Sequence, residues 1–289
     1  MDFFGFLISA GSFILPIFVF LTMFNVGLTQ KPTDIAEYYQ KWQFMLRMLL
    51  GNFLLAPLVM FLLLQLFGLT SDFATGLMIF SLTAGAPFLI KLPQYSGHSL
   101  ALGASLMLLL VVGTVGVLPL ALPLVLPGVE VDAGAIALNL LRQLVWPIVL
   151  GVIFAWLLPA LTDTIQLWVA KVGSLAMNIL LLCYIVGYIP RVLSDFGNYA
   201  LAILVGLLFV AAAFAIGWFL GGRSNRDDAQ DVGALGTAQR NTAASMLVAS
   251  ANFGQVPNVL VIITLVNALG IQLMRLVAKR LSQDNHTSL

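Results

Sequence analysis

Long apolar stretches follow one another along almost the whole chain, separated by short polar connections. A helix that crosses a bilayer needs about 20 consecutive, mostly apolar residues. Nine stretches meet this requirement, at about residues 3–28, 45–67, 73–95, 99–123, 134–157, 164–187, 197–220, 232–252 and 256–278. The pattern predicts an all-α integral membrane protein with about nine transmembrane helices, in which residues 1–289 form a single polytopic membrane domain.

Composition strengthens this prediction. Hydrophobic residues make up 61% of the 289 residues and charged residues only 9%, and the mean hydropathy is +1.03. Soluble globular proteins have about a quarter charged residues, so the solvent of this chain is lipid. The net charge of +1 gives no reason to expect nucleic acid as a partner. The single cysteine, Cys183, excludes an internal disulfide framework.

Lysine and arginine residues gather on one side of the predicted spans. With the N-terminus on the first side, only Arg191 lies on that side, while Arg142 and Arg240 fall inside spans. The other ten basic residues lie on the second side: Lys31, Lys41, Arg47, Lys91, Lys171, Arg223, Arg226, Arg275, Lys279 and Arg280. Cytoplasmic loops are enriched in basic residues. We therefore expect an external N-terminus, a cytoplasmic C-terminus and a location in the plasma (inner) membrane.

The third and eighth predicted spans differ from the others. Residues 84–93 of the third read AGAPFLIKLP, and residues 233–245 of the eighth read GALGTAQRNTAAS. Glycine, proline and polar residues in a span are tolerated where protein or a wet cavity satisfies the freed backbone groups. Paired interrupted segments in two halves of a chain indicate the binding site of a secondary transporter. The layout predicts an inverted repeat, with halves at 1–125 and 134–279 and a cytoplasmic tail at 280–289.

Each interrupted span carries a cation. Arg240 lies about 14 Å along a helix from Asp231, which is deep for a charge that must reach water. Such charges are costly and usually mark a site or a pathway, although a structural pair between helices is the alternative for Arg240. Lys91 lies near a connection, so its long stem could equally extend to the cytoplasmic interface. Arg142 is a third basic residue inside a span with no evident partner.

Four short motifs resemble the bile acid:sodium symporter family. They are NVGLTQKPTD at 25–34, GNFLLAPL at 51–58, GAP at 85–87, and GTAQRNTAAS followed by ANF at 236–253. The resemblance implies a core domain, in which two broken helices cross, and a panel domain packed against it. It also implies alternating-access symport of organic anions, such as bile acids, steroid sulfates and keto or hydroxy carboxylates, usually with sodium.

The resemblance places candidate site residues at both helix breaks. Asn52 falls where the family has an amide side chain that binds sodium, Pro87 lies at the first break, and Asn241 matches the asparagine of the second crossing. Aligned in this way, Gly236 replaces the acidic sodium ligand and Arg240 replaces a glutamine. A shifted alignment that used Gln239 would restore an oxygen ligand and lose the match at Asn241.

This departure leaves two coupling schemes open. In the first, Arg240 takes over the charge of a lost sodium site and faces an anionic substrate, while Lys91 exchanges a proton, because desolvation and a neighbouring arginine lower the pKa of a lysine. In the second, sodium binds through Asn52, Thr237, Gln239 and main-chain carbonyl groups. The expected coupling ion is therefore Na⁺ or H⁺, with no other cofactor.

Other classes of function fit the sequence less well. An enzyme would need acids, bases or metal ligands within the spans, yet the chain has only two histidines and no HExxH motif. A channel would need rings of like side chains. A sensor or receptor on a transporter fold is the alternative from another class. The expected partners are a small organic anion and membrane lipid, and the sequence gives no oligomeric state.

Overall fold

The computed structural model describes residues 2–30, 41–90, 100–125, 132–222 and 228–287, and every regular element in these ranges is helical. The elements are α1 (Phe3–Thr29), α3 (Trp42–Leu50), η1 (Gly51–Leu55), α4 (Ala56–Phe67), α5 (Ser71–Leu82), η2 (Pro87–Ile90), α7 (Leu100–Val125), α8 (Ala133–Leu140), η3 (Leu141–Val145), α9 (Trp146–Leu157), α10 (Pro159–Gly187), α11 (Ile189–Ser194), α12 (Phe196–Gly221), α13 (Asp228–Ala238), α14 (Thr242–Phe253) and α15 (Pro257–Thr287).

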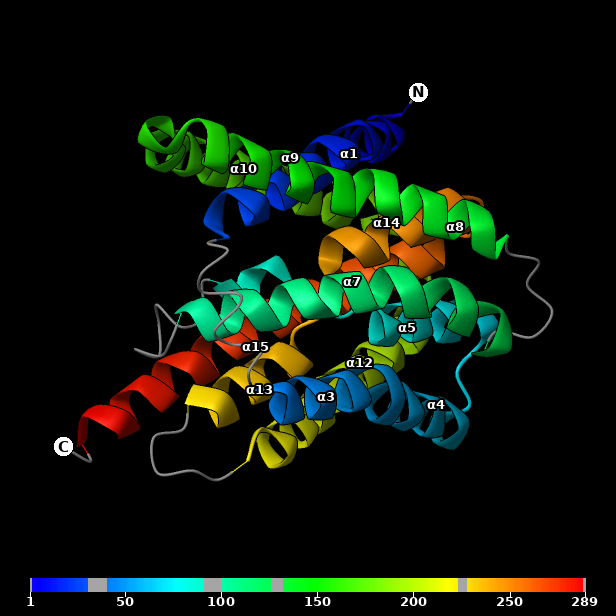
Figure 1. The fold of residues 1–289 in the computed structure, drawn as a ribbon. Helices are drawn as coiled ribbons and strands as arrows, with labels where there is room; N and C mark the ends of the chain where they lie inside the picture. Colours follow the sequence, from blue (N-terminus) through cyan, green and yellow to red (C-terminus); the bar gives the residue numbers. More distant parts are fainter. Residues whose placement is uncertain (1, 31–40, 91–99, 126–131, 223–227, 288–289) are drawn as a thin grey trace.

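Seven helices within the described residues are long and apolar enough to cross a membrane. They correspond to all the predicted spans except the third and the eighth, each of which is interrupted. The sixth span begins at Pro159 rather than at residue 164, and α15 continues to Thr287, through most of the predicted tail. The start of α1 and the end of α15 lie at opposite ends of the molecule (Figure 1).

Two of the long helices contain a π-helical turn just before a proline. The turn η1 lies two residues before Pro57, and η3 lies two residues before Pro147. A proline inside a helix donates no hydrogen bond and clashes with the carbonyl group four residues earlier, and a wider turn accommodates both effects. Asn52 and Arg142 both lie in these π-helical turns.

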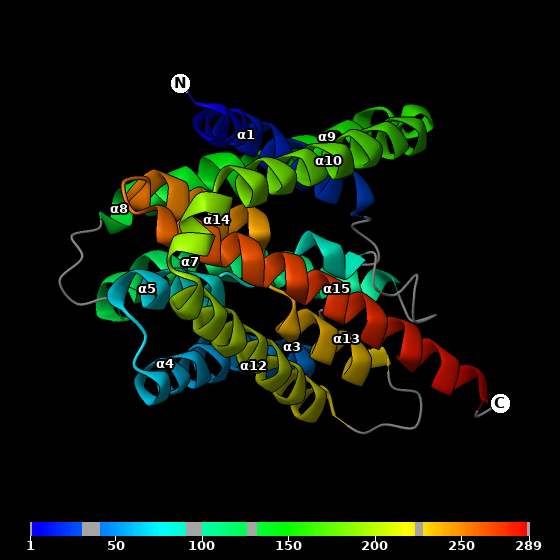
Figure 2. The same ribbon diagram turned by 180° about the vertical axis from the view of Figure 1, so that it is seen from behind.

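The helices form two groups. The first group, α1, α9 and α10, lies together as one layer. In the second group, α7, α14 and α15 lie next to this layer, and α3, α4, α12 and α13 lie on their far side (Figures 1 and 2). Glycines allow close approach within each group. A Cβ on Gly27 of α1 would meet the backbone of α9 at Ile148, and a Cβ on Gly217 of α12 would meet the backbone of α13 at Gly233.

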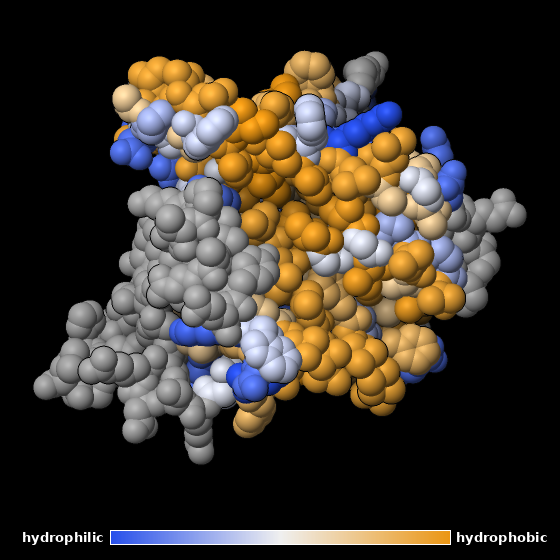
Figure 3. All heavy atoms as spheres, viewed as in Figure 1, coloured by the Kyte–Doolittle hydropathy of each residue, from blue (hydrophilic) through white to orange (hydrophobic). Residues whose placement is uncertain are grey.

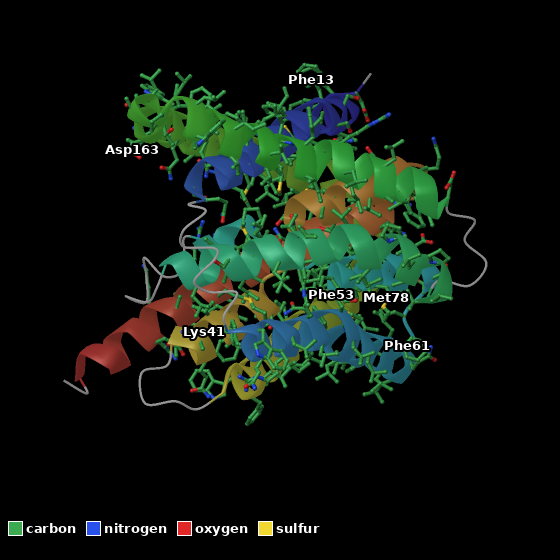
Figure 4. The ribbon with its side chains drawn as sticks, viewed as in Figure 1. Phe13, Lys41, Phe53, Phe61, Met78 and Asp163 are labelled. Carbon is green, nitrogen blue, oxygen red and sulfur yellow. The ribbon has the colours of Figure 1, made fainter. Side chains whose placement is uncertain are left out.

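The outer surface is strongly apolar. In the view of Figure 3, hydrophobic residues cover the middle of the molecule and hydrophilic residues lie mainly toward its two ends. Figure 4 shows Phe13 and Phe61 pointing outward, with 74% and 42% of their surfaces exposed, whereas Phe53 points toward α7 and packs against Gly113. Soluble proteins rarely expose such large apolar areas, so this chain is an integral membrane protein.

Candidate helix crossing and cavity

The two interrupted spans touch each other at their breaks. The helix α5 ends at Leu82 and α13 ends at Ala238, and non-helical residues follow both. The backbone N–H of Asn241 donates to the carbonyl oxygen of Thr83 at 2.9 Å, and its side-chain Nδ2 donates to the carbonyl oxygen of Gly85 at 3.0 Å. The sequence predicted both interruptions, and the structure joins them through Asn241.

Asn241 also starts α14. Its side-chain Oδ1 accepts a hydrogen bond from the backbone N–H of Ala244 at 3.1 Å, as an N-cap residue does. With Nδ2 bound to Gly85, both polar atoms of the side chain are engaged in holding the crossing together. The geometry therefore gives Asn241 a structural position at the crossing.

The first break is held by Thr114 of α7, a residue outside the motifs and candidate sites found in the sequence. The Thr114 Oγ1 accepts from the backbone N–H of Ala84 at 3.0 Å and donates to the Ala84 carbonyl oxygen at 3.1 Å. Gly85 follows with a φ of +79°, and a Cβ on it would lie 2.5 Å from the backbone nitrogen of Val111. A lone threonine in the apolar stretch VVGTVGV was the available sequence signal.

Arg240 and Asn52 meet in the interior. The Arg240 guanidinium is fully buried, and its Nη1 donates to the Oδ1 of Asn52 at 3.1 Å. Its Cζ lies 5.1 Å from the centre of the Phe209 ring on α12, which allows a cation–π interaction. Among the described residues, the Arg240 Nε and Nη2 have no hydrogen-bond partner.

Asn52 connects this pair to α13. Its Nδ2 donates to the Oγ1 of Thr237 at 3.1 Å and to the carbonyl oxygen of Met48 at 2.9 Å. Asn52 and Thr237 are fully buried. Their side-chain oxygens, which were expected as sodium ligands, already accept hydrogen bonds from Arg240 and from Asn52, respectively.

The remaining predicted site residues have different surroundings. Gln239 donates to the Oδ1 of Asn267 on α15 at 3.3 Å. A Cβ on Gly236 would lie 3.1 Å from the side chains of both Leu106 and Leu89, so this position is an apolar packing site. Lys91 lies outside the described residues, and Pro87 begins η2.

A cavity of about 210 Å³ lies beside the crossing. Its walls come from α1, α10, α14, α15 and the two breaks: Phe18, Leu21, Thr22, Asn25, Val26, Ala86, Pro87, Val169, Ala170, Gly173, Ser174, Met177, Asn178, Leu181, Gln239, Arg240, Thr242, Ala243, Ala268, Ile271, Gln272 and Arg275. Of the two arginines in this lining, Arg275 is half-buried and Arg240 is fully buried, and the lining contains no aspartate or glutamate. The cavity therefore favours an anion.

The cavity brings together only part of the predicted site. Pro87, Gln239 and Arg240 line it, whereas Asn52, Gly236, Thr237 and Asn241 do not. The Arg240 side chain has no accessible surface and reaches Asn52 and Phe209, neither of which lines the cavity. The polar residues from α1 and α10 and the half-buried Arg275 were missed, because sequence shows them only as isolated polar positions in apolar helices.

No group of three or more histidine, cysteine, aspartate or glutamate side chains that could hold a metal ion occurs in the described part of the chain. A cation at the crossing would therefore depend on amide, hydroxyl and carbonyl oxygens. The Asn52 Oδ1 is such an oxygen, and it already accepts the hydrogen bond from Arg240.

Two comparisons with known proteins bear on the identity of the chain. No curated protein matches the chain. A sequence model of the sodium bile acid symporter family matches residues 16–194, more than half of the 289 residues. The matched region includes Asn52, Thr83–Pro87 and Thr114, and ends before α13 and Arg240. Together with the apolar helices, this match establishes that the chain belongs to the sodium bile acid symporter family, a family of membrane transporters.

Proposed function

We propose that this protein is a secondary active transporter of a small organic anion, which binds in the cavity between the α1–α10 layer and the helix crossing. Alternating access then arises from movement of the α1, α8–α9 and α10 panel against a core made by the other helices. The contact between the two breaks at Asn241, Thr83 and Gly85 supports this arrangement. Both interrupted spans count as crossings in it, giving nine spans in two inverted halves at 1–125 and 134–279, with the tail at 280–289.

The chemistry of the cavity supports an anionic substrate. Arg275 lines it beside Gln272, to which its Nη1 donates at 3.4 Å. Thr242 and Ala243, the first residues of α14, also line it, and the N-terminus of a helix carries partial positive charge. Ligand pockets commonly measure about 300–1,000 Å³, so a volume of about 210 Å³ favours a small carboxylate or sulfonate over a steroid.

We assign Arg240 the position of the coupling cation. The observation that carries this assignment is the 3.1 Å hydrogen bond from its Nη1 to the Asn52 Oδ1, the oxygen that family resemblance gives to sodium. A sodium ion about 4 Å from the guanidinium would be repelled by about 4 kcal/mol at an effective dielectric constant of 20. The C-terminal ends of α5 and α13, which adjoin the breaks, favour a single cation.

This assignment modifies the simpler expectation that Arg240 faces the substrate. Its guanidinium has no accessible surface in the described conformation, so the direct anion contact falls to Arg275. Lys91 remains the candidate for proton exchange. The cavity uses the second half of α1, the middle of α10 and residues 268–275 of α15. In the orientation that the charge distribution predicts, α1 and α15 would place it toward the basic, cytoplasmic side.

The first test is thermal stability of the purified protein in sodium chloride or choline chloride, with a panel of small carboxylates and sulfonates. A ligand present at 100 times its dissociation constant stabilises the folded state by about 2.7 kcal/mol. We expect one class of anion to raise the melting temperature equally in both salts, and Arg275→Gln to lose most of this shift.

Two matched variants test the role of Arg240. Arg240→Gln supplies a side-chain oxygen beside those of Asn52 and Thr237, so we expect it to gain stabilisation by sodium over choline. Arg240→Met removes the charge without adding an oxygen and should gain none. Stabilisation of the unmodified protein by sodium would contradict the assignment. Saturable uptake into vesicles would distinguish a transporter from a sensor on the same fold.

A further inference from the structure

The most unusual exposed side chain is Arg142. It lies in η3, near the middle of the apolar span Ala133–Leu157, and its surface is exposed. Leu138, Leu141 and Trp146, within one turn of it, are also exposed, with 46–59% of their surfaces accessible. Leu140, Leu144 and Ile148 form the opposite, buried face. Arg142 therefore points out of the protein, toward the membrane.

Nothing in the described part of the protein neutralises this charge. No hydrogen bond or ion pair joins Arg142 to another described residue, and it does not line the cavity. Ionisable side chains in membrane spans almost always face the protein interior or water, because exposure to hydrocarbon costs several kcal/mol. Because no described residue meets the guanidinium, it can bind a group of the surrounding membrane.

The depth of Arg142 limits what that group can be. At 1.5 Å per residue, Arg142 lies about 14 Å along the helix from Ala133 and about 22 Å from Leu157. A hydrocarbon core about 30 Å thick centred on this helix would bury the Arg142 Cα by about 10 Å on the Ala133 side. Helix side chains lean toward the N-terminus, so the guanidinium extends toward that nearer interface.

A neighbouring pair of side chains indicates polar surroundings at this depth. In the same turn as Arg142, the Gln143 Nε2 donates to the Asn139 Oδ1 at 2.6 Å, and this pair is only half-buried. The polar interface therefore extends inward along this face.

We infer that Arg142 binds the phosphate of a phospholipid whose headgroup is drawn inward against η3. A guanidinium forms strong, charge-assisted hydrogen bonds to phosphate, which every phospholipid carries. A second copy of the chain fits less well, because a two-fold contact centred on this face would bring the two Arg142 guanidinium groups together. The site lies away from the transport cavity and binds structural lipid rather than substrate.

Lipid binding to the purified, delipidated protein tests this inference. Dioleoylphosphatidylglycerol, dioleoylphosphatidylcholine, dioleoylglycerol and inorganic phosphate would each be added, and bound lipid and oligomeric state measured by native mass spectrometry. We expect both phospholipids to bind. Dioleoylglycerol, which lacks the phosphate, and inorganic phosphate, which lacks the acyl chains, should not bind. Arg142→Leu should weaken phospholipid binding about tenfold, and Arg142→Lys should weaken it less.

The matched control is Arg280→Leu, which removes the same charge from an exposed position near the end of α15 and should leave phospholipid binding unchanged. Unchanged phospholipid binding in Arg142→Leu would overturn the inference. A dimer of the unmodified protein that dissociates in Arg142→Leu would also overturn the inference, because it would assign this face to a second copy of the chain. Arg142→Leu replaces an exposed charge with an apolar side chain facing lipid, so its melting temperature in detergent should not fall.

Discussion

At the scale of single residues, few side chains stabilise the buried charge of Arg240. The Asn52 Oδ1 is its one hydrogen-bond acceptor among the side chains that the structure describes, and Phe209 provides a ring face. A buried charge that loses its partner is left with its full desolvation penalty. Asn52, on a π-helical turn, is therefore as important for the crossing as Arg240 itself.

Replacing Asn52 with leucine should reveal this dependence. We expect Asn52→Leu to lower the free energy of unfolding by about 3 kcal/mol, because a buried guanidinium loses its acceptor. In the double variant Asn52→Leu/Arg240→Met, much of this loss should disappear. The measurement is a double-mutant cycle of thermal or denaturant stability in detergent. Strictly additive effects would show that the two side chains are energetically independent.

At the scale of elements, the breaks depend on the neighbouring helices. Thr114 of α7 supplies hydrogen bonds that the helix would otherwise have made at Ala84, and Gly85 fits against the backbone of α7 at Val111. The broken span is therefore specified by its contact with α7 as well as by its own glycine and proline residues.

Substitutions at three glycines separate the cost of a positive φ from the cost of a clash with α7. Gly85→Ala should destabilise the protein by at least about 2 kcal/mol, because it combines a φ of +79° with a clash at Val111. Gly68 has a φ of +60°, and an added Cβ would have no neighbour within 4 Å, so Gly68→Ala should lose only about 1 kcal/mol. Gly116→Ala, in open space on α7, should gain up to about 1 kcal/mol. Melting temperatures measure all three, and equal losses at Gly85 and Gly68 would contradict a role for α7.

At the scale of the whole molecule, the two groups of helices have their ends on two opposite sides. The connection after α4 and the start of α5 lie on one side, and the connection between α9 and α10 lies on the other (Figure 1). Lys41 and Asp163 lie at the same end of the molecule (Figure 4). The distribution of basic residues predicts that this end is cytoplasmic.

Labelling of single cysteines tests that orientation. The only native thiol, Cys183, is buried and would first be replaced in a Cys183→Ala background. In intact cells, we expect a membrane-impermeant maleimide to label Ser71→Cys, at the exposed start of α5, and not Asp163→Cys, at the exposed start of α10. Both should react after permeabilisation. The reverse pattern in intact cells would place the N-terminus in the cytoplasm.

The sequence by itself determined the helical, membrane-embedded architecture and the positions of the two breaks. Runs of apolar residues, interrupted by Gly85, Pro87 and the polar patch at 237–241, are local features, and lipid forces apolar segments into helices because their backbone groups must be satisfied internally. The family motifs are local in the same sense, and the family match agrees with them. The ends of some elements shifted, most clearly at Pro159 instead of residue 164 and at Thr287 instead of residue 278.

Tertiary structure decided how these local features meet. Arg240 and Asn52 are 188 residues apart, and Thr114 lies 30 residues from Ala84, so no local pattern could join them. The cavity draws on α1, α10 and α15, which are distant in sequence. The direction in which Arg142 and Arg240 point, one outward and one inward, follows from helix packing. Such contacts depend on the approach of whole helices, whereas the helices themselves depend on neighbouring residues and on lipid.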